Sequence, residues 1–265
     1  MYTFILAAVA ILPAIFLCIY IYKKDTVEKE PIGLLVKLFF LGVVSVVPAF
    51  ILETLVSEFF GVCFNLPFIG PILDALIGVA VIEEGCKLFF LHIGTRNSKE
   101  FNYMFDAIVY SVFISLGFAA LENVGYVFQN GLEVGIVRAV LSIPGHMFFA
   151  IAMGYYYGQW NINRKLEMLT EKNYVGLPTE NPYSVKRKKY MLLALIIPTL
   201  IHGIYDYLCL NVETYTWFVL LFIVFVIAMY IYFFNCIRSL SKNDVPTEVG
   251  MRESVQETME TTPKN

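Results

Sequence analysis

Charged residues are scarce in this sequence. Only 15% of the 265 residues are Asp, Glu, Lys or Arg, whereas 58% are hydrophobic and the mean hydropathy is +0.68. A soluble globular domain carries about 25% charged residues. The deficit excludes an ordinary soluble domain and predicts an all-α, polytopic membrane helix bundle.

Several patterns that mark other protein classes are absent too. The five cysteines include no CxxC pair, so they indicate buried small side chains rather than a disulfide framework or a metal cage, although a Cys63–Cys209 bond is conceivable. The sequence has no basic face of the kind that binds nucleic acid. It also has no internal repeat, which leaves inverted-repeat transporters without support.

Long apolar runs are abundant instead. A membrane-spanning helix needs about 20 apolar residues. Seven predicted spans meet this need, at residues 3–22, 32–53, 71–93, 104–128, 136–160, 190–211 and 215–235. The first run lacks the positive region and cleavage site of a signal peptide, so we expect it to be a retained span. Residues 1–240 are expected to form a single membrane-embedded domain, followed by a disordered cytoplasmic tail at 241–265.

The basic residues indicate the orientation of the chain. Of the 19 Lys and Arg residues, 16 lie in the connections after the first, third and fifth predicted spans or after the seventh, and three lie within spans. By the positive-inside rule, the N-terminus is outside and the C-terminus is cytoplasmic in a multi-pass protein of the plasma membrane. Arg138, near the start of the fifth predicted span, is expected to anchor that helix at the outer interface.

The spans bury ionisable residues, most conspicuously in the stretch VIEEGCKLFF at 81–90. A charge at the bilayer centre costs about 2.5–3.5 kcal/mol on insertion scales, so such residues are functional by default. The set comprises Glu83, Glu84 and Lys87 in the third predicted span, Asp106 and Glu122 in the fourth, His146 in the fifth, and His202 and Asp206 in the sixth. At 1.5 Å of rise per residue, Glu83 and the acids and histidines of the other three spans lie roughly 8–18 Å below the outer surface, whereas Asp106 lies near the cytoplasmic end. Four spans are therefore expected to bring their acids and histidines to one layer.

Helical spacing predicts that this layer faces the interior of the bundle. His146 is followed on the same face by Gly154 and Gly158, and small residues mark the side of a membrane helix that packs on other helices. His202 shares a face with Asp206, one turn later. A hydrogen bond between helices would explain either histidine taken singly, but not both at the depth of neighbouring acids.

Some residues have simpler interpretations. Lys87 is expected to neutralise one glutamate of its own helix at i,i+3 or i,i+4. Asp106 and Tyr110 are one turn apart near the cytoplasmic end, where a structural hydrogen bond between them is favoured. His92, beside Thr95 and Arg96, is interpreted as a residue of the membrane interface.

Two histidines and several carboxylates in one dry layer suit hydrolysis of an amide by two routes. They can hold Zn²⁺, with His146, His202 and Glu122 as candidate ligands, and Zn²⁺ lowers the pKa of its bound water. Alternatively, a glutamate activates a water directly while His or Asn donates to the oxyanion. A proton-coupled transporter that uses the same carboxylates as a relay, and a non-catalytic scaffold, are the remaining alternatives.

The polar segments resemble the motifs of the PrsW family of intramembrane proteases, which belongs to a wider clan with the CAAX prenyl proteases and bacteriocin-processing enzymes. The matching segments, in the family's order and spacing, are EEGCK at 83–87, FDAIVY at 105–110, GFAALEN at 117–123, PGHMFF at 144–149 and HGIYD at 202–206. They cover roughly residues 80–210, which places the catalytic core at about 71–211. The resemblance implies cleavage of a single-span anti-sigma factor at its first, extracytoplasmic site.

The resemblance also implies roles for individual residues. Glu83 and Glu84 would supply the activating carboxylate, and His146 would help to hold the attacking water or a metal ion. His202, with Asp206 one turn later, would stabilise the oxyanion. The supporting positions implied in addition are Lys87, Asp106, Glu122 and Asn123. Lys87 replaces an arginine that the wider clan has one residue later in the motif, and Ser142 replaces a phenylalanine. These two departures argue against a prenyl-protein substrate.

Overall fold

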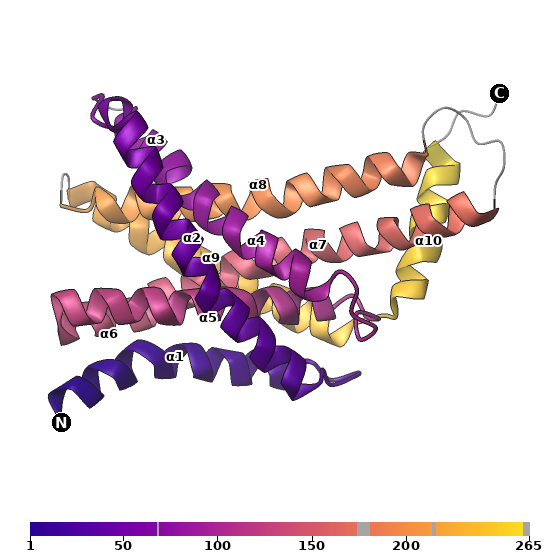
Figure 1. The fold of residues 1–265 in the computed structure, drawn as a ribbon, viewed down its shortest axis with the longest axis horizontal. Coiled ribbons are helices and arrows are strands. Elements are labelled where there is room, and N and C mark those ends of the chain that lie inside the picture. The colour runs from indigo at the N-terminus through magenta and orange to yellow at the C-terminus, as the bar shows by residue number, and fades with distance from the viewer. Residues whose placement is uncertain (68, 174–180, 214–215, 262–265) are drawn as a thin grey trace.

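The protein folds into a bundle of long helices (Figure 1). The computed structural model describes residues 1–67, 69–173, 181–213 and 216–261, and this part of the chain contains no β-strand. Its elements are α1 (Tyr2–Lys24), α2 (Ile32–Phe64), α3 (Gly70–Leu73), the π-helix η1 (Asp74–Ala80), α4 (Val81–Thr95), α5 (Asp106–Asn130), α6 (Leu132–Val140), α7 (Ser142–Asn173), α8 (Pro182–Leu210), α9 (Thr216–Lys242) and α10 (Thr247–Thr261). The predicted all-α membrane bundle is confirmed.

Six helical segments in the described ranges are long and apolar enough to cross a membrane. They are α1, α2, α5, α6 together with α7 (Leu132–Thr170), α8 and α9. The third predicted span, 71–93, corresponds to α3, η1 and α4, which follow one another without a gap, although none reaches 18 residues alone. The seven-span count and the orientation of the termini stay predictions.

Helix α5 is the centre of the bundle. Within its most apolar window 83% of the residues are buried, against 28% in α1, α2 and α9. Glycines allow its neighbours to come close: a Cβ built on Gly117 would lie 2.0 Å from the carbonyl oxygen of Phe39 in α2, and one on Gly154 of α7 would lie 2.6 Å from the Cα of Ile108. Helix backbones therefore touch along α5, as expected for small residues in membrane helices.

A π-helix leads directly into the acidic stretch. The segment η1 ends at Ala80 and α4 begins at Val81, so Glu83 and Glu84 stand in the first turn of α4. π-helical turns are rare and occur mostly at functional sites. Neither the apolar periodicity nor any motif in the sequence predicts this one.

The two ends of the bundle differ. The N-terminus and the start of α6 lie at one end, and the α1–α2 connection and α10 lie at the other (Figure 1). Where the sequence predicts a disordered tail from residue 241, α9 continues to Lys242 and α10 follows. Two apolar residues of α10, Met251 and Val255, pack against Ile162 and Leu166 of α7, which gives this polar segment a hydrophobic contact.

The acids near α10 have structural roles. Asp106 accepts hydrogen bonds from the backbone N–H groups of Asn102 and Tyr103, at 2.9 and 2.7 Å, and so holds the loop that enters α5. The hydroxyl of Tyr110 donates to Glu30 at 2.8 Å, and not to Asp106 as the helical spacing suggests. Glu30, in the α1–α2 connection, is the closer acceptor for a side chain that points away from its own helix.

Candidate active site

Lys87 lies at the centre of the buried polar residues. Its Nζ is 2.9 Å from Glu83 Oε2 and 2.8 Å from Glu84 Oε1. It is also 3.1 Å from His146 Nδ1 and lies over the ring of Phe118, 4.2 Å from the centroid. The side chains of Lys87 and Glu84 are completely buried. The i,i+3 and i,i+4 pairing predicted from the sequence is present, and the ammonium contacts both carboxylates rather than one.

One arm of the network runs from His146 to Arg138. His146 Nε2 is 2.9 Å from Glu122 Oε2, and Glu122 Oε1 is 2.8 Å from Arg138 Nη2. Because the ammonium of Lys87 can only donate, His146 accepts at Nδ1 and donates from Nε2 to Glu122. This arrangement fixes the tautomer and directs the lone pair of Nδ1 at the ammonium of Lys87.

The other arm runs through His202. Its Nδ1 is 3.0 Å from Glu84 Oε1, and its Nε2 is 3.2 Å from Asp206 Oδ2. Carboxylates only accept, so an imidazole between two of them donates from both nitrogens as an imidazolium. Phe149 stacks on this ring with a centroid separation of 4.5 Å and an interplanar angle of 19°. The aromatic face favours a positive ring.

The two arms meet between the histidines, whose ring centroids are 5.5 Å apart. Five helices supply the side chains of the two arms: α4, α5, α6, α7 and α8. The sequence-predicted residues that the structure brings together are Glu83, Glu84, Lys87, Glu122, His146, His202 and Asp206. Asp106 is not among them, because it precedes Glu122 by 16 residues of one helix, about 24 Å of rise.

Arg138 is the residue that sequence reasoning missed. Its place at the outer interface stays a prediction, but its contacts were not predicted: besides Glu122, its Nε donates to Asn123 Oδ1 at 3.0 Å, and its guanidinium lies 3.8 Å from the ring centroid of Tyr126. Asn123 in turn donates to the backbone of Ala10 at 3.0 Å. A count of charges on each helix would have been the signal for this pair. Glu122 has no Lys or Arg on its own helix, so its cation has to come from a neighbouring one.

The site contains donors that suit a metal ion. Among the described residues, Glu83, Glu84 and His146 form the group whose ligand atoms lie within 4.8 Å of one another. Glu84 Oε2 is buried and has no hydrogen-bond partner. A histidine that donates its other N–H to a carboxylate, as His146 does to Glu122, is typical of metal sites.

The chemistry of this group fits Zn²⁺, which binds imidazole nitrogen and carboxylate oxygen. Lys87 Nζ contacts the same three side chains, so a metal ion would take the place of the ammonium there. Of the candidate ligands taken from the sequence, His146 belongs to the group, whereas His202 and Glu122 contact its members from outside. The five cysteines are free, and Cys63 is exposed rather than buried.

Known proteins resemble this chain over most of its length. The model of the "PrsW family intramembrane metalloprotease" matches residues 30–233. Protease PrsW of Clostridioides difficile is 36% identical over 233 residues, 86% of each chain, and Protease PrsW of Bacillus subtilis is 32% identical over 223 residues, 84% of this chain and 90% of that one. No solved structure matches significantly. The chain belongs to the PrsW family and is a multi-pass membrane protease.

Proposed function

We propose that this protease hydrolyses a peptide bond near the outer end of a single-span membrane protein, and that the substrate is an anti-sigma factor whose cleavage at this first site starts sigma-factor activation. The observation that carries the proposal is the link between the α4 carboxylates and both histidines: Glu84 contacts His202 directly, and Lys87 joins Glu84 to His146. Glu122 and His202 each precede the end of their helix by eight residues, about 12 Å, at the end predicted to be outside. The family assignment favours proteolysis over proton-coupled transport.

Glu83 is the proposed general base. A base must reach the attacking water, and 7% of the surface of the Glu83 side chain is exposed, whereas Glu84 has none. Glu84 instead accepts hydrogen bonds from Lys87 and His202 through Oε1. We therefore assign Glu84 to holding the site and Glu83 to proton transfer.

His202 is the proposed oxyanion donor. An N–H group aimed at the developing negative charge stabilises a tetrahedral intermediate, and it does so most strongly in a dry site. The N–H that would turn to the oxyanion is the Nε2–H, whose contact with Asp206 at 3.2 Å is the longer of the ring's two, while Glu84 keeps the ring oriented through Nδ1. Lys87 donates hydrogen bonds to both neighbouring acids and adds positive charge to the same region.

The reaction balances with these groups. Glu83 takes a proton from water, the hydroxide adds to the carbonyl carbon of the peptide bond, and His202 donates to the oxygen. The C–N bond then breaks, and the proton held by Glu83 passes to the leaving amine. Arg138 and Glu122 act through His146 by fixing its tautomer and are positioning residues.

As the alternative to direct activation of water by Glu83, we propose that Glu83, Glu84 and His146 hold the metal that the family description implies. Zn²⁺ would lower the pKa of a bound water and polarise the carbonyl. Elemental analysis of the purified protein should find about one zinc per chain, and less in Glu84→Gln and His146→Gln proteins. Full cleavage by protein that contains no metal would overturn the metal assignment and leave direct activation of water by the glutamate.

The central experiment is cleavage of a co-expressed anti-sigma factor, followed by immunoblotting. Glu83→Gln, Glu84→Gln and His202→Ala should reduce cleavage by about 10²–10⁴-fold, the usual contribution of acid–base groups. The matched control is Glu133→Gln, since Glu133 is an exposed glutamate at the same end of the bundle. Wild-type cleavage by all three site variants would overturn the site. Cleavage of another single-span protein, but not of the anti-sigma factor, would overturn the substrate.

A further inference from the structure

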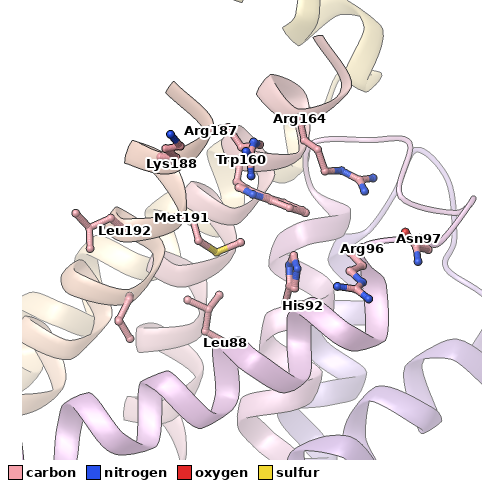
Figure 2. Close-up of a pocket in the computed structure, with 11 residues that line it drawn as sticks. Leu88, His92, Arg96, Asn97, Trp160, Arg164, Arg187, Lys188, Met191 and Leu192 are labelled. Atoms are coloured by element: carbon pink, nitrogen blue, oxygen red, sulfur yellow. The ribbon is translucent and has the colours of Figure 1, made fainter. Parts of the chain in front are cut away.

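A second site lies on the same three helices as the active site, toward their other ends. A cavity of about 750 Å³ opens between α4, α7 and α8 (Figure 2). Its basic lining consists of His92, Arg96, Arg164, Arg187 and Lys188. No carboxylate is among the described residues that line it. The positive-inside rule places this end of the bundle at the cytoplasmic surface.

Most of this positive charge is not neutralised by protein. Glu167 pairs with Arg187, with Oε2 2.5 Å from Nε. Arg96, Arg164 and Lys188 have no carboxylate within 4.0 Å in the part of the chain that the structure describes. Three cations beside one cavity repel one another, so the arrangement favours an anion between them.

Two buried nitrogens in the cavity wall point to the same conclusion. Arg164 Nε and His92 Nδ1 are buried without a hydrogen-bond partner. Figure 2 shows His92 and Trp160 between Arg96 and Arg164 on one side and Arg187 and Lys188 on the other. A buried polar nitrogen without a partner costs free energy unless a ligand or a water satisfies it.

The remaining wall is apolar and leads toward the active site. Its apolar residues are Leu88 of α4 and Met191, Leu192 and Leu195 of α8. Leu88 follows Glu84 by one turn on α4, so the cavity begins directly below the catalytic layer. A ligand that fills the cavity therefore needs an anionic head for the basic end and an apolar part for this wall.

We propose that this cavity binds an anionic phosphate group at the cytoplasmic surface, the head of a phospholipid whose acyl chain lies along Leu88 and Leu195. Arginine forks match phosphate oxygens, and basic pockets between membrane helices recognise lipid head groups. The apolar wall favours a lipid over a soluble phosphate as the source. The inference is independent of the substrate and chemistry of the active site, because its test measures binding.

The experiment uses the full-length protein, freed of lipid in an uncharged detergent. Native mass spectrometry and thermal unfolding are measured with phosphatidylglycerol, with phosphatidylcholine, and with inorganic phosphate against chloride of equal ionic strength. The test variant is R96Q/R164Q, and the matched control is K99Q/R238Q, which removes two exposed charges outside the cavity. R96Q/K188Q, which changes two exposed residues, replaces the test variant if R96Q/R164Q does not fold.

The wild-type protein should retain and be stabilised by phosphatidylglycerol but not by phosphatidylcholine. Each charge removed from the cavity should weaken this binding about fivefold, so the test variant loses about 25-fold while the control changes less than twofold. Equal stabilisation by inorganic phosphate, lost in the test variant, would support the phosphate site and assign it to a soluble phosphate. Equal losses in the test and control variants, or no stabilisation by either anion, would overturn the proposal.

Discussion

Replacing Lys87 by methionine would remove the cation that lies between Glu83 and Glu84. The two carboxylates are 2.9 and 2.8 Å from Nζ; Glu84 is completely buried and Glu83 is only 7% exposed, so water cannot replace the ammonium between them. Breaking a buried ion pair by deleting one partner costs about 3–5 kcal/mol, because a charge is left uncompensated. We expect the free energy of unfolding to fall by this amount. Methionine keeps most of the volume of the lysine stem, so little of the loss would arise from a cavity.

A double-mutant cycle isolates this interaction. Glu84→Gln removes one of the stranded charges, so Lys87→Met should cost less in that background, with a coupling energy of about 1–3 kcal/mol. Unfolding is measured in mixed micelles by circular dichroism, and Lys37→Met serves as the control, since Lys37 is exposed on α2. Strict additivity of the two variants, or a loss below about 1 kcal/mol for Lys87→Met alone, would refute the reasoning.

Other residues give simpler tests. Gly117→Ala should prevent normal folding, because its Cβ would lie 2.0 Å from the Phe39 carbonyl oxygen, whereas Gly125→Ala in the same helix meets nothing within 4 Å and should leave the yield of folded protein unchanged. Arg138→Gln should lower cleavage about 10–100-fold by releasing the carboxylate that orients His146, with partial recovery in Arg138→Lys; unchanged cleavage would exclude this role. Burial raises the pKa of Asp244 from 3.8 to about 6, so its contribution to stability is present below pH 3.8 and is lost as the pH rises through 6. Asp244→Asn should flatten the thermal midpoint over this pH window, and an unaltered pH profile would contradict the assignment.

Composition and apolar run length were sufficient to predict the membrane bundle. Both signals are summed over all residues of a span, so a single atypical residue hardly changes the prediction. The ends of elements depend on a few contacts instead. α10 is polar overall and forms because Met251 and Val255 meet α7, a contact between segments about 90 residues apart that no local pattern reveals. The division of the fifth predicted span at Leu141 likewise has no signal in its apolar residues.

The candidate site could be predicted as a set of residues but not as a network. Helical rise places acids and histidines at similar depths, and their contacts in the structure agree with that estimate. Depth does not say which atoms pair. Lys87 contacts two glutamates where the sequence predicts one, and Arg138 of α6 pairs with Glu122 of α5. Both contacts depend on the angular positions of the helices around the bundle.

The π-helix before α4 determines where its two acids face. A π turn contains one residue more than the α turn it replaces, and each added residue rotates everything after it by about 100°. If η1 tightened into an α-helix with all its residues kept, α4 would rotate by about this angle, and Glu83 would then face roughly where Glu84 now does. The direction of the two acids thus depends on the extra residue in the turn before them. The register of this span is therefore as important for the site as the side chains themselves.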